Sequence, residues 1–425
     1  MNQEVVAMTK KLARFVTKID AKDIPAHVFD HAKVAFLDWI AVTLAGKDDP
    51  AVKKLLQYSE TMGGNKQATV LGHGTKTNIS HATLINGTAS HALDYDDTLE
   101  VFLGHPSVTI FPSLLALGEW TGKSGPEFLS AYITGLKVGA VIGACGGMDH
   151  YMSGWHATST LGHFASAAGG AKLMGLDEGQ KVNALGIAGT QASGLKRVFG
   201  TMCKPFHAGR SSQAGMLSAL LAENGFTSAE DILEGNHGFF HVLNGKVNDK
   251  VLGTLGKTWD IENLAQKYHA SCHATHSPIE GTLSIMQENR IALEDIASIR
   301  IFCSQLSLDA AGNNQPRSGL EGKFSISYCV ANALNRKKTG IAAFSDVKVN
   351  DPEIKEFMKK ISVAHTEDFK GLEARIELET NSGAVYNATS NILKDIPGLE
   401  EKKVKIGPKF GGLCSPLLGN GRTRD

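Results

Sequence analysis

The sequence predicts a mainly α-helical protein, with a large all-helical domain and a smaller α+β domain. Apolar residues recur at i, i+3, i+4 and i+7 through most of the first 260 residues, which is the stripe of amphipathic helices. Polar and apolar residues alternate, as they do in half-buried strands, only after residue 265. The length of 425 residues is also too great for one small core and favours two domains.

The expected helices of the first domain follow this periodicity, and several are rich in Ala, Gly and Ser. Small residues let helix axes approach closely, so we expect 161–171 and 186–194 to be buried against other helices. The expected helices cover residues 5–19, 31–44, 51–62, 79–92, 110–121, 126–145, 160–174, 178–195 and 212–224.

The second domain is expected to mix strands and helices. Residues 298–302, 342–349 and 374–379 alternate as strands do, and a turn at 381–383 followed by 384–389 predicts a hairpin. Helices are expected at 278–288, 325–334 and 352–361. The predicted domains are 1–265, completed by 395–425, and 266–394.

The composition argues against several functions. Basic and acidic residues number 43 each, so the net charge is zero and no broad basic field exists to bind nucleic acid. The longest uncharged stretches, such as 101–118, contain His and Pro and are not expected to span a membrane. The six cysteines form no CxxC pair and are interpreted as reduced thiols. Residues 1–4 lack a signal-peptide pattern, so we expect a cytoplasmic protein.

Four polar segments interrupt the apolar pattern, and each precedes or ends a buried helix. Placing ionisable groups near a core costs free energy, so their density indicates catalysis or tight binding. His156 is expected at a helix N-terminus, where the helix dipole attracts an anionic ligand. Lys204 is expected just outside another helix, because Pro205 suits a first turn. The segments are Asp94–Thr98 with His105, Tyr151–His156, Lys204–Arg210 and Lys267–His276.

Three other hypotheses compete with metal-free acid–base chemistry. Asp96-Asp97-x-x-Glu100 could hold Mg²⁺ in a terpenoid synthase, but the second metal-binding motif is missing: near Asn248, Gly253 stands where a hydroxyl is needed. A non-catalytic helical scaffold would have no reason to keep polar segments at buried helix ends. The third hypothesis is a zinc site of His269, Cys272, His273 and His276, but these residues would spread over adjacent helical turns without a fourth, distant ligand. We therefore expect no metal and no cofactor.

Together the polar segments resemble the MmgE/PrpD family. The resemblance covers about residues 5–400 in order, and it implies a helical domain, a smaller α+β lid, a homodimer and no metal or organic cofactor. Two departures are His269, where the family often has Pro, and 410–425, which stops short of the family's usual final helices. The motifs that carry the resemblance are Asp94-Tyr95-Asp96-Asp97-Thr98, His105-Pro106-Ser107, Gly154-Trp155-His156-Ala157-Thr158, Lys204-Pro205-Phe206-His207-Ala208-Gly209 and Lys267–His276.

The resemblance also implies a set of site residues. Asp96 and Asp97 are expected to cap or brace their loop rather than to face the substrate. From the third polar segment we add Arg210 as a substrate-binding candidate. The residues that match the family's site are Asp94, Thr98, His105, His156, Lys204, His276 and Tyr328, together with Lys267 and Tyr151.

We expect a cofactor-independent lyase that dehydrates or decarboxylates a small di- or tricarboxylate such as 2-methylcitrate or cis-aconitate. His105 and His156 are the expected acid–base pair, because an imidazole with a pKa of ~6.5 takes or gives a proton at neutral pH. Asp94 would orient an imidazole, and Lys204 and His276 would bind carboxylates. The alternative is epimerisation of an iminodicarboxylate such as iminodisuccinate, which the family also performs.

Overall fold

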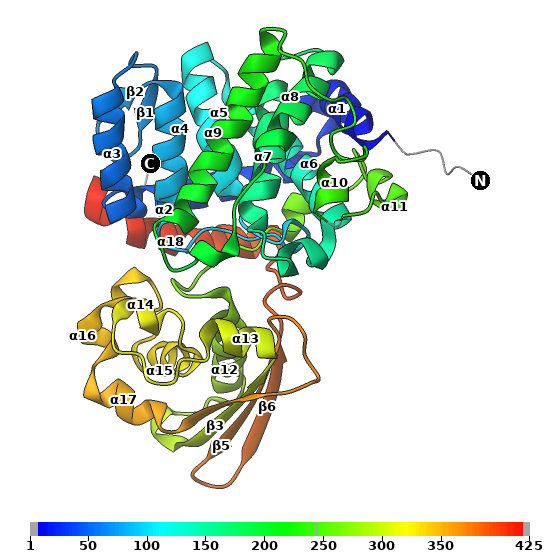
Figure 1. Ribbon diagram of the computed structural model, residues 1–425. Helices are drawn as coiled ribbons and strands as arrows, with labels where there is room; N and C mark the ends of the chain where they lie inside the picture. Colours follow the sequence, from blue (N-terminus) through cyan, green and yellow to red (C-terminus); the bar gives the residue numbers. More distant parts are fainter. Residues whose placement is uncertain (1–6, 244, 420–425) are drawn as a thin grey trace. The chain divides into compact units, whose positions relative to one another are not determined.

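The computed structural model describes residues 7–243 and 245–419, and the chain divides into two compact units (Figure 1). The helical unit comprises Met1–Gln266 and Gly398–Asp425, and the α+β unit comprises Lys267–Pro397. The protein is mostly helical, and a small sheet lies in its C-terminal part, which confirms the predicted mainly α fold class. That the α+β unit serves as a lid stays a prediction.

The helical unit is built from long helices and one short hairpin of two strands, β1 and β2. Most of its long helices begin or end within a few residues of the predicted bounds. The helices are α1 (Met8–Lys18), α2 (Ala26–Gly46), α3 (Pro50–Met62), α4 (Ile79–His91), α5 (Ser107–Thr121), α6 (Gly125–Met152), α7 (Ala157–Leu173), α8 (Glu178–Gln191), α9 (Cys203–Glu223), α10 (Phe239–Val242), α11 (Asp249–Leu252) and α18 (Leu399–Leu418), and the strands are β1 (Ala68–Val70) and β2 (Thr75–Thr77).

Close helix packing brings the ends of α4 and α9 toward the same region. Helix α9 contacts α4, α5 and α7, and α5 also contacts α4 and α7 (Figure 1). A Cβ atom added to Gly87 of α4 would lie 2.6 Å from the Cα of Gly209 in α9, so both positions need glycine for this approach. Of the two segments expected to be buried, 161–171 is buried throughout, whereas 189–193 is half-buried or exposed and α8 ends at Gln191. The last residue of α4 and the first turn of α9 carry groups of the candidate site.

Helix α6 is the one helix of the described chain that is long and apolar enough to cross a membrane. Of its most apolar window, 83% is buried inside the protein, as in the core helix of a globular unit. Gly147, with φ of 65°, interrupts the helical backbone shortly before Tyr151.

The α+β unit contains one four-stranded sheet in the order β4-β3-β5-β6. Strand β3 pairs in parallel with β4 and antiparallel with β5, and β5 and β6 form the predicted hairpin. Helix α12 packs against β5 and β6. The elements are α12 (His276–Asn289), β3 (Ile296–Cys303), α13 (Gln305–Ala311), α14 (Gly319–Gly322), α15 (Ile326–Arg336), α16 (Asp346–Val349), α17 (Pro352–Met358), β4 (Ile361–His365), β5 (Ala374–Thr380) and β6 (Val385–Ser390).

The predicted strand at 342–349 is wrong. Residues 341–344 form a 3₁₀ turn, and α16 follows at Asp346–Val349. The Ser345 side chain accepts a hydrogen bond from the backbone N–H of Lys348, so it caps α16. A polar–apolar alternation alone therefore did not distinguish a strand from two short helical turns joined by a cap.

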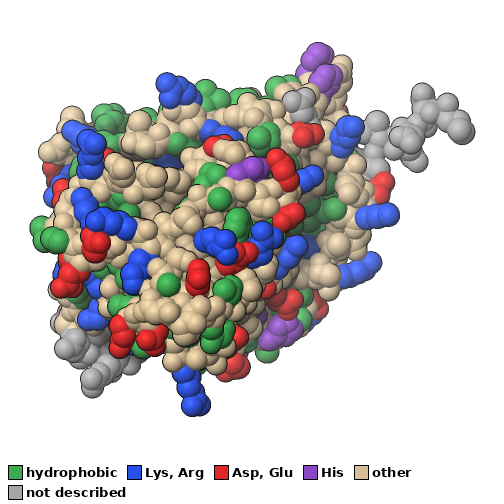
Figure 2. All heavy atoms as spheres, turned by 90° about the horizontal axis from the view of Figure 1, so that it is seen from below, with side chains coloured by type: hydrophobic (Ala, Val, Ile, Leu, Met, Phe, Trp, Pro, Cys, Tyr) green, Lys and Arg blue, Asp and Glu red, His purple; other side chains and the backbone are tan. Residues whose placement is uncertain are grey.

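The surface carries charges of both signs. On the face shown in Figure 2, Lys and Arg side chains are intermixed with Asp and Glu side chains. This distribution agrees with a net charge of zero over the sequence.

Candidate functional site

The first polar segment forms the loop between α4 and α5, which we call the motif loop (residues 92–106). Asp94 has a φ of 53°, a left-handed conformation that Asp tolerates better than most residues. At Thr98 the backbone exchanges two hydrogen bonds with Ala265, at 2.9 and 2.8 Å. Backbone hydrogen bonds at Thr98 therefore hold the loop, and the Asp94 side chain projects from a left-handed backbone conformation.

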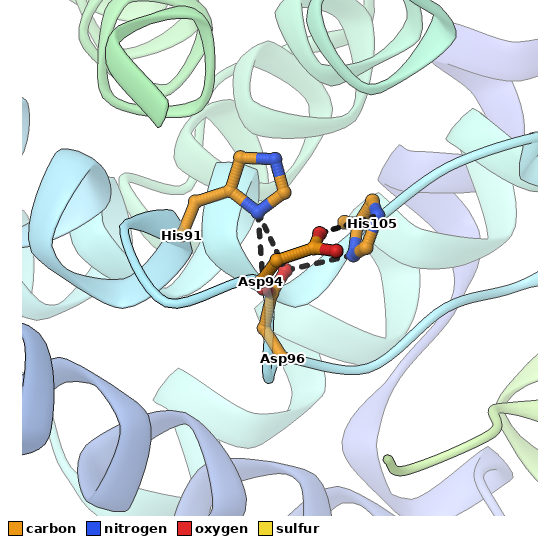
Figure 3. A group of neighbouring side chains, drawn as sticks. All are labelled: His91, Asp94, Asp96 and His105. Atoms are coloured by element: carbon orange, nitrogen blue, oxygen red, sulfur yellow. Dashed lines mark hydrogen bonds and ion pairs between the residues drawn. The ribbon is translucent and has the colours of Figure 1, made fainter. Parts of the chain in front are cut away.

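Two carboxylates of the motif loop meet two imidazoles (Figure 3). Nδ1 of His91, the last residue of α4, lies 3.0 Å from both oxygens of Asp96. Nδ1 of His105 lies 2.9 Å from Asp96 Oδ2, whereas its Nε2 is 3.9 Å from Asp94 Oδ1. Asp96 is 1% exposed and His91 is also 1% exposed. The carboxylate nearest to His105 is thus Asp96 and not Asp94, which was the residue expected to orient an imidazole.

A lysine and a second pair of imidazoles adjoin this group. The prediction that Lys204 lies just outside the helix is wrong, because α9 begins at Cys203 and Lys204 is its second residue; its Nζ is 2.6 Å from Asp94 Oδ1. His156 is the N-cap residue of α7, so its predicted place at a helix N-terminus is confirmed. Its Nδ1 lies 3.0 Å from Nδ1 of His207, and its ring stacks 6.2 Å from that of His91.

Burial and neighbouring charges set the protonation states of these groups. Burial lowers the pKa of His91 to about 4. Burial, with the nearby His91 and Lys204, lowers the pKa of His156 well below its usual value. Burial alone would raise the pKa of Asp96, but the imidazoles of His91 and His105 hold it well below its usual range. At neutral pH, His91 and His156 are therefore neutral and Asp96 is a carboxylate.

The C-terminal helix supports the motif loop from within the core of the helical unit. Nζ of Lys409 in α18 lies 2.6 Å from Asp38 Oδ1 and donates a hydrogen bond of 2.7 Å to the carbonyl oxygen of Tyr95. Beside it, Asp97 accepts a 2.5 Å hydrogen bond from the hydroxyl of Ser107. Burial and the nearby Asp38 raise the pKa of Asp97 well above its usual value, which favours the protonated form of this carboxyl group.

The four side chains of Figure 3 have ligand atoms within 4.8 Å of one another, the one such group in the described part of the chain. His and Asp are suitable ligands for a divalent ion. However, the Lys204 ammonium already neutralises Asp94 at 2.6 Å and would repel a second cation. The residues fit a carboxylate paired with lysine better than they fit a resident metal ion.

Three predicted site residues lie in the α+β unit. His276 is 1% exposed, and burial with the nearby His273, His269 and Lys267 lowers its pKa well below the usual value. Tyr328 is fully buried, and its hydroxyl donates a 2.5 Å hydrogen bond to the carbonyl oxygen of Ala343. Lys267 is 1% exposed. The roles of these residues stay predictions.

The zinc hypothesis receives no support from the described residues of the α+β unit. His269 binds Glu280 through Nε2 at 2.8 Å and Thr339 through Nδ1 at 2.7 Å, so both of its ring nitrogens are engaged. The single metal-like group among the described residues lies elsewhere.

Two further candidates of the helical unit, Tyr151 and Arg210, contact residues outside the group drawn in Figure 3. The ring of Tyr151 lies beneath Lys196, whose Nζ is 3.7 Å from the ring centre. Arg210 binds the side chain of Gln213 at 2.8 Å, one helical turn along α9. Neither contact joins these residues to the carboxylate–imidazole group, and their roles stay predictions.

Sequence reasoning missed His91 and His207 as members of this group. Both had a usable signal, because each lies three residues from a candidate, His91 before Asp94 and His207 after Lys204. On α9 a spacing of three places Lys204 and His207 on one face of the helix.

The buried, neutral His163 should make the stability of the helical unit depend on pH. The pKa of His163 in α7 is about 4 when folded and ~6.5 when unfolded, so below pH 6.5 the unfolded chain binds a proton that the folded chain does not. The free energy of unfolding is therefore not reduced by His163 above pH 6.5, and it falls as the pH drops from 6.5 toward 4. In His163→Gln, the slope of unfolding free energy against pH should fall by about 1 kcal/mol per pH unit between pH 4.5 and 6.

Urea unfolding monitored by tryptophan fluorescence measures this slope, because all four tryptophans lie in the helical unit. The comparison of slopes is independent of any constant loss of stability that the substitution causes. An unchanged slope would contradict the protonation state assigned to His163.

A buried carboxylate, neutral imidazoles and a lysine ammonium form a set of groups suited to proton transfer beside an anionic ligand.

Two domain descriptions match the chain: the MmgE/PrpD N-terminal domain over residues 10–251 and the MmgE/PrpD C-terminal domain over residues 269–424. The chain belongs to the MmgE/PrpD family, which confirms the resemblance seen in the polar segments.

Several relatives are similar to the chain over most of its length. A cis-aconitate decarboxylase of Aspergillus terreus is 28% identical over 98% of this chain and 91% of its own length. A cis-aconitate decarboxylase-like protein of Aspergillus oryzae is also 28% identical, over 98% of this chain and 92% of its own length. The cis-aconitate decarboxylase of Mus musculus is 24% identical over 91% of this chain and 82% of its own length.

Proposed function

We propose that this protein is a cofactor-independent lyase that removes CO₂ from cis-aconitate or a closely related tricarboxylate. The observation that carries the proposal is the grouping of Lys204, His105 and His156 around the motif loop of a chain similar to cis-aconitate decarboxylases. The lysine supplies positive charge for a carboxylate, and the imidazoles supply proton transfer.

The proposed reaction breaks one carbon–carbon bond and forms one carbon–hydrogen bond. One substrate carboxylate leaves as CO₂, and its bonding electron pair stays on the carbon skeleton as a carbanion stabilised by conjugation with a neighbouring carboxylate. His105, as an imidazolium, delivers a proton to that carbanion, and the neutral imidazole that remains regains a proton from water before the next turnover.

Lys204 is the residue proposed to bind a remaining carboxylate. Its ammonium now pairs with Asp94 at 2.6 Å, and its side chain is 20% exposed. A substrate carboxylate can take over this charge-assisted contact, and the ammonium then lowers the free energy of negative charge that develops in the transition state.

The proposal is tested by incubating the enzyme in D₂O with cis-aconitate, 2-methylcitrate and iminodisuccinate in separate NMR samples. We expect cis-aconitate to lose CO₂ and to gain one deuterium on carbon, at the same rate after EDTA treatment and with added Mg²⁺. Loss of water from 2-methylcitrate alone would instead identify a dehydratase.

Exchange of deuterium into iminodisuccinate without net conversion would instead identify an epimerase. Absence of any change in all three samples would overturn the proposal, as would activity that disappears with EDTA and returns with Mg²⁺.

A further inference from the structure

We propose that Asp96 is the positioning residue of this site: it holds the proton on Nδ1 of His105, so that Nε2 is the ring atom that takes up a proton from water and delivers it to the substrate, and His91 holds Asp96 in place. The kinetic part of this inference rests on the proposed function, whereas its structural part does not. The role differs from the one expected for Asp94, and it involves a histidine that the family motifs did not indicate.

The geometry favours one position for each proton. An ionised carboxylate only accepts hydrogen bonds, so a ring nitrogen that faces Asp96 is favoured to carry a proton. Nδ1 of His91 meets both Asp96 oxygens at 3.0 Å, and Nδ1 of His105 approaches Oδ2 at 2.9 Å from another side (Figure 3). The contact of His105 is at ion-pair distance but is not well aligned as a hydrogen bond, and catalytic hydrogen bonds often tighten only when substrate binds.

His91 is suited to hold Asp96 and not to exchange protons with substrate. Its side chain is fully buried, and its low pKa keeps it neutral at neutral pH. By contrast, the His105 side chain is 13% exposed and can reach a ligand. The two histidines therefore have different roles: the buried His91 holds the Asp96 carboxylate, and the more exposed His105 contacts the substrate.

The adjacent residue, Asp97, provides a matched control. Asp96 and Asp97 are both 1% exposed, but Asp97 contacts Ser107 and no imidazole. Burial raises the pKa of Asp97, so an amide at this position reproduces the shape of the favoured, uncharged form of its carboxyl group. At Asp96 an amide removes a charge and also places an N–H where both histidines need an acceptor.

The test compares Asp96→Asn, Asp97→Asn and His91→Asn with the wild-type enzyme. For Asp96→Asn we expect kcat for cis-aconitate to fall about 10²–10⁴-fold, with KM changed by less than about threefold. Asp97→Asn should keep kcat within about threefold of wild type. His91→Asn keeps a donor to Asp96 and should lower kcat by about tenfold.

A second readout does not depend on activity. In protein labelled with ¹⁵N-histidine, ring-nitrogen shifts give the tautomer of His105, whose signals are those absent from His105→Gln. We expect a proton on Nδ1 in the wild type, in Asp97→Asn and in His91→Asn, and a loss of that single tautomer in Asp96→Asn. Circular dichroism establishes that each variant is folded.

The outcomes separate the two proposals. A proton on Nε2 of His105 in the wild-type enzyme, or an unchanged tautomer in folded Asp96→Asn, would overturn the positioning role of Asp96. Equal losses of kcat in Asp96→Asn and Asp97→Asn would overturn it as well. Should Asp96→Asn fail to fold, the wild-type tautomer and the effect of His91→Asn still decide the question. Failure of the wild type to convert cis-aconitate counts against the proposed function alone, because the tautomer is measured without turnover.

Discussion

Replacing His105 with alanine should lower kcat for cis-aconitate by about 10²–10⁴-fold while leaving the helical unit folded, because the variant loses a proton-transfer group. His105 approaches Asp96 through one ring nitrogen and Asp94 through the other, and its side chain is 13% exposed. It is therefore the imidazole of the motif loop that can reach a ligand. Steady-state kinetics measure the loss, and unfolding followed by tryptophan fluorescence measures the stability of the helical unit.

The matched control is His27→Ala, in which an exposed histidine of the same unit loses only a surface contact with Glu262. It should keep kcat within about twofold of wild type. If His105→Ala kept near-normal kcat, the residue would have no part in proton transfer. If it lost stability in proportion to activity, its role would be structural, since a proton-transfer group can be removed without unfolding the protein.

The elements that could be predicted are those whose signal is local. Periodicity placed most of the long helices within a few residues of their observed ends, and the turn at 381–383 correctly indicated the β5–β6 hairpin. The segment 342–349 failed because the capping side chain of Ser345 stabilises a helical turn there instead of a strand. The alternation at 298–302 and 374–379 is shorter still, and both segments are strands.

The site was only partly predictable for a similar reason. Asp94, His105 and Lys204 were candidates because each stands in a dense polar segment, and their side chains lie close together. The sequence could not show which of the adjacent residues Asp94, Asp96 and Asp97 faces His105. That choice depends on the left-handed backbone at Asp94 and on the position of His91 at the end of α4.

The pair formed by Asp38 and Lys409 left no signal at all. The two residues are 371 positions apart, and Lys409 lies in α18, a helix that the periodicity did not predict. Only the fold brings the two charges together. A contact of this kind can hold the motif loop in place, although no sequence motif indicates it.

Replacing Lys409 with methionine should therefore destabilise the helical unit by about 3–5 kcal/mol. The Lys409 side chain is 2% exposed and that of Asp38 is 1% exposed, at a separation of 2.6 Å. Methionine leaves the Asp38 carboxylate buried without its counter-charge and also removes the donor to the Tyr95 carbonyl. The matched control is Lys405→Met on the same helix: Lys405 pairs with Glu401 at the surface, so its loss should cost at most about 1 kcal/mol.

The dependence on pH identifies the cause of this loss. Burial raises the pKa of Asp38 even with Lys409 present, and removal of the ammonium should raise it further. The folded variant then keeps a proton that the unfolded chain releases, so its stability is retained at low pH and lost as pH rises. Urea unfolding followed by tryptophan fluorescence should show a smaller penalty for Lys409→Met at pH 5 than at pH 8, and Asp38→Asn added to Lys409→Met should recover much of the loss. A penalty that is equal at both pH values and is not relieved by Asp38→Asn would mean that packing by the long side chain, and not the buried charge pair, is what holds α18 against the motif loop.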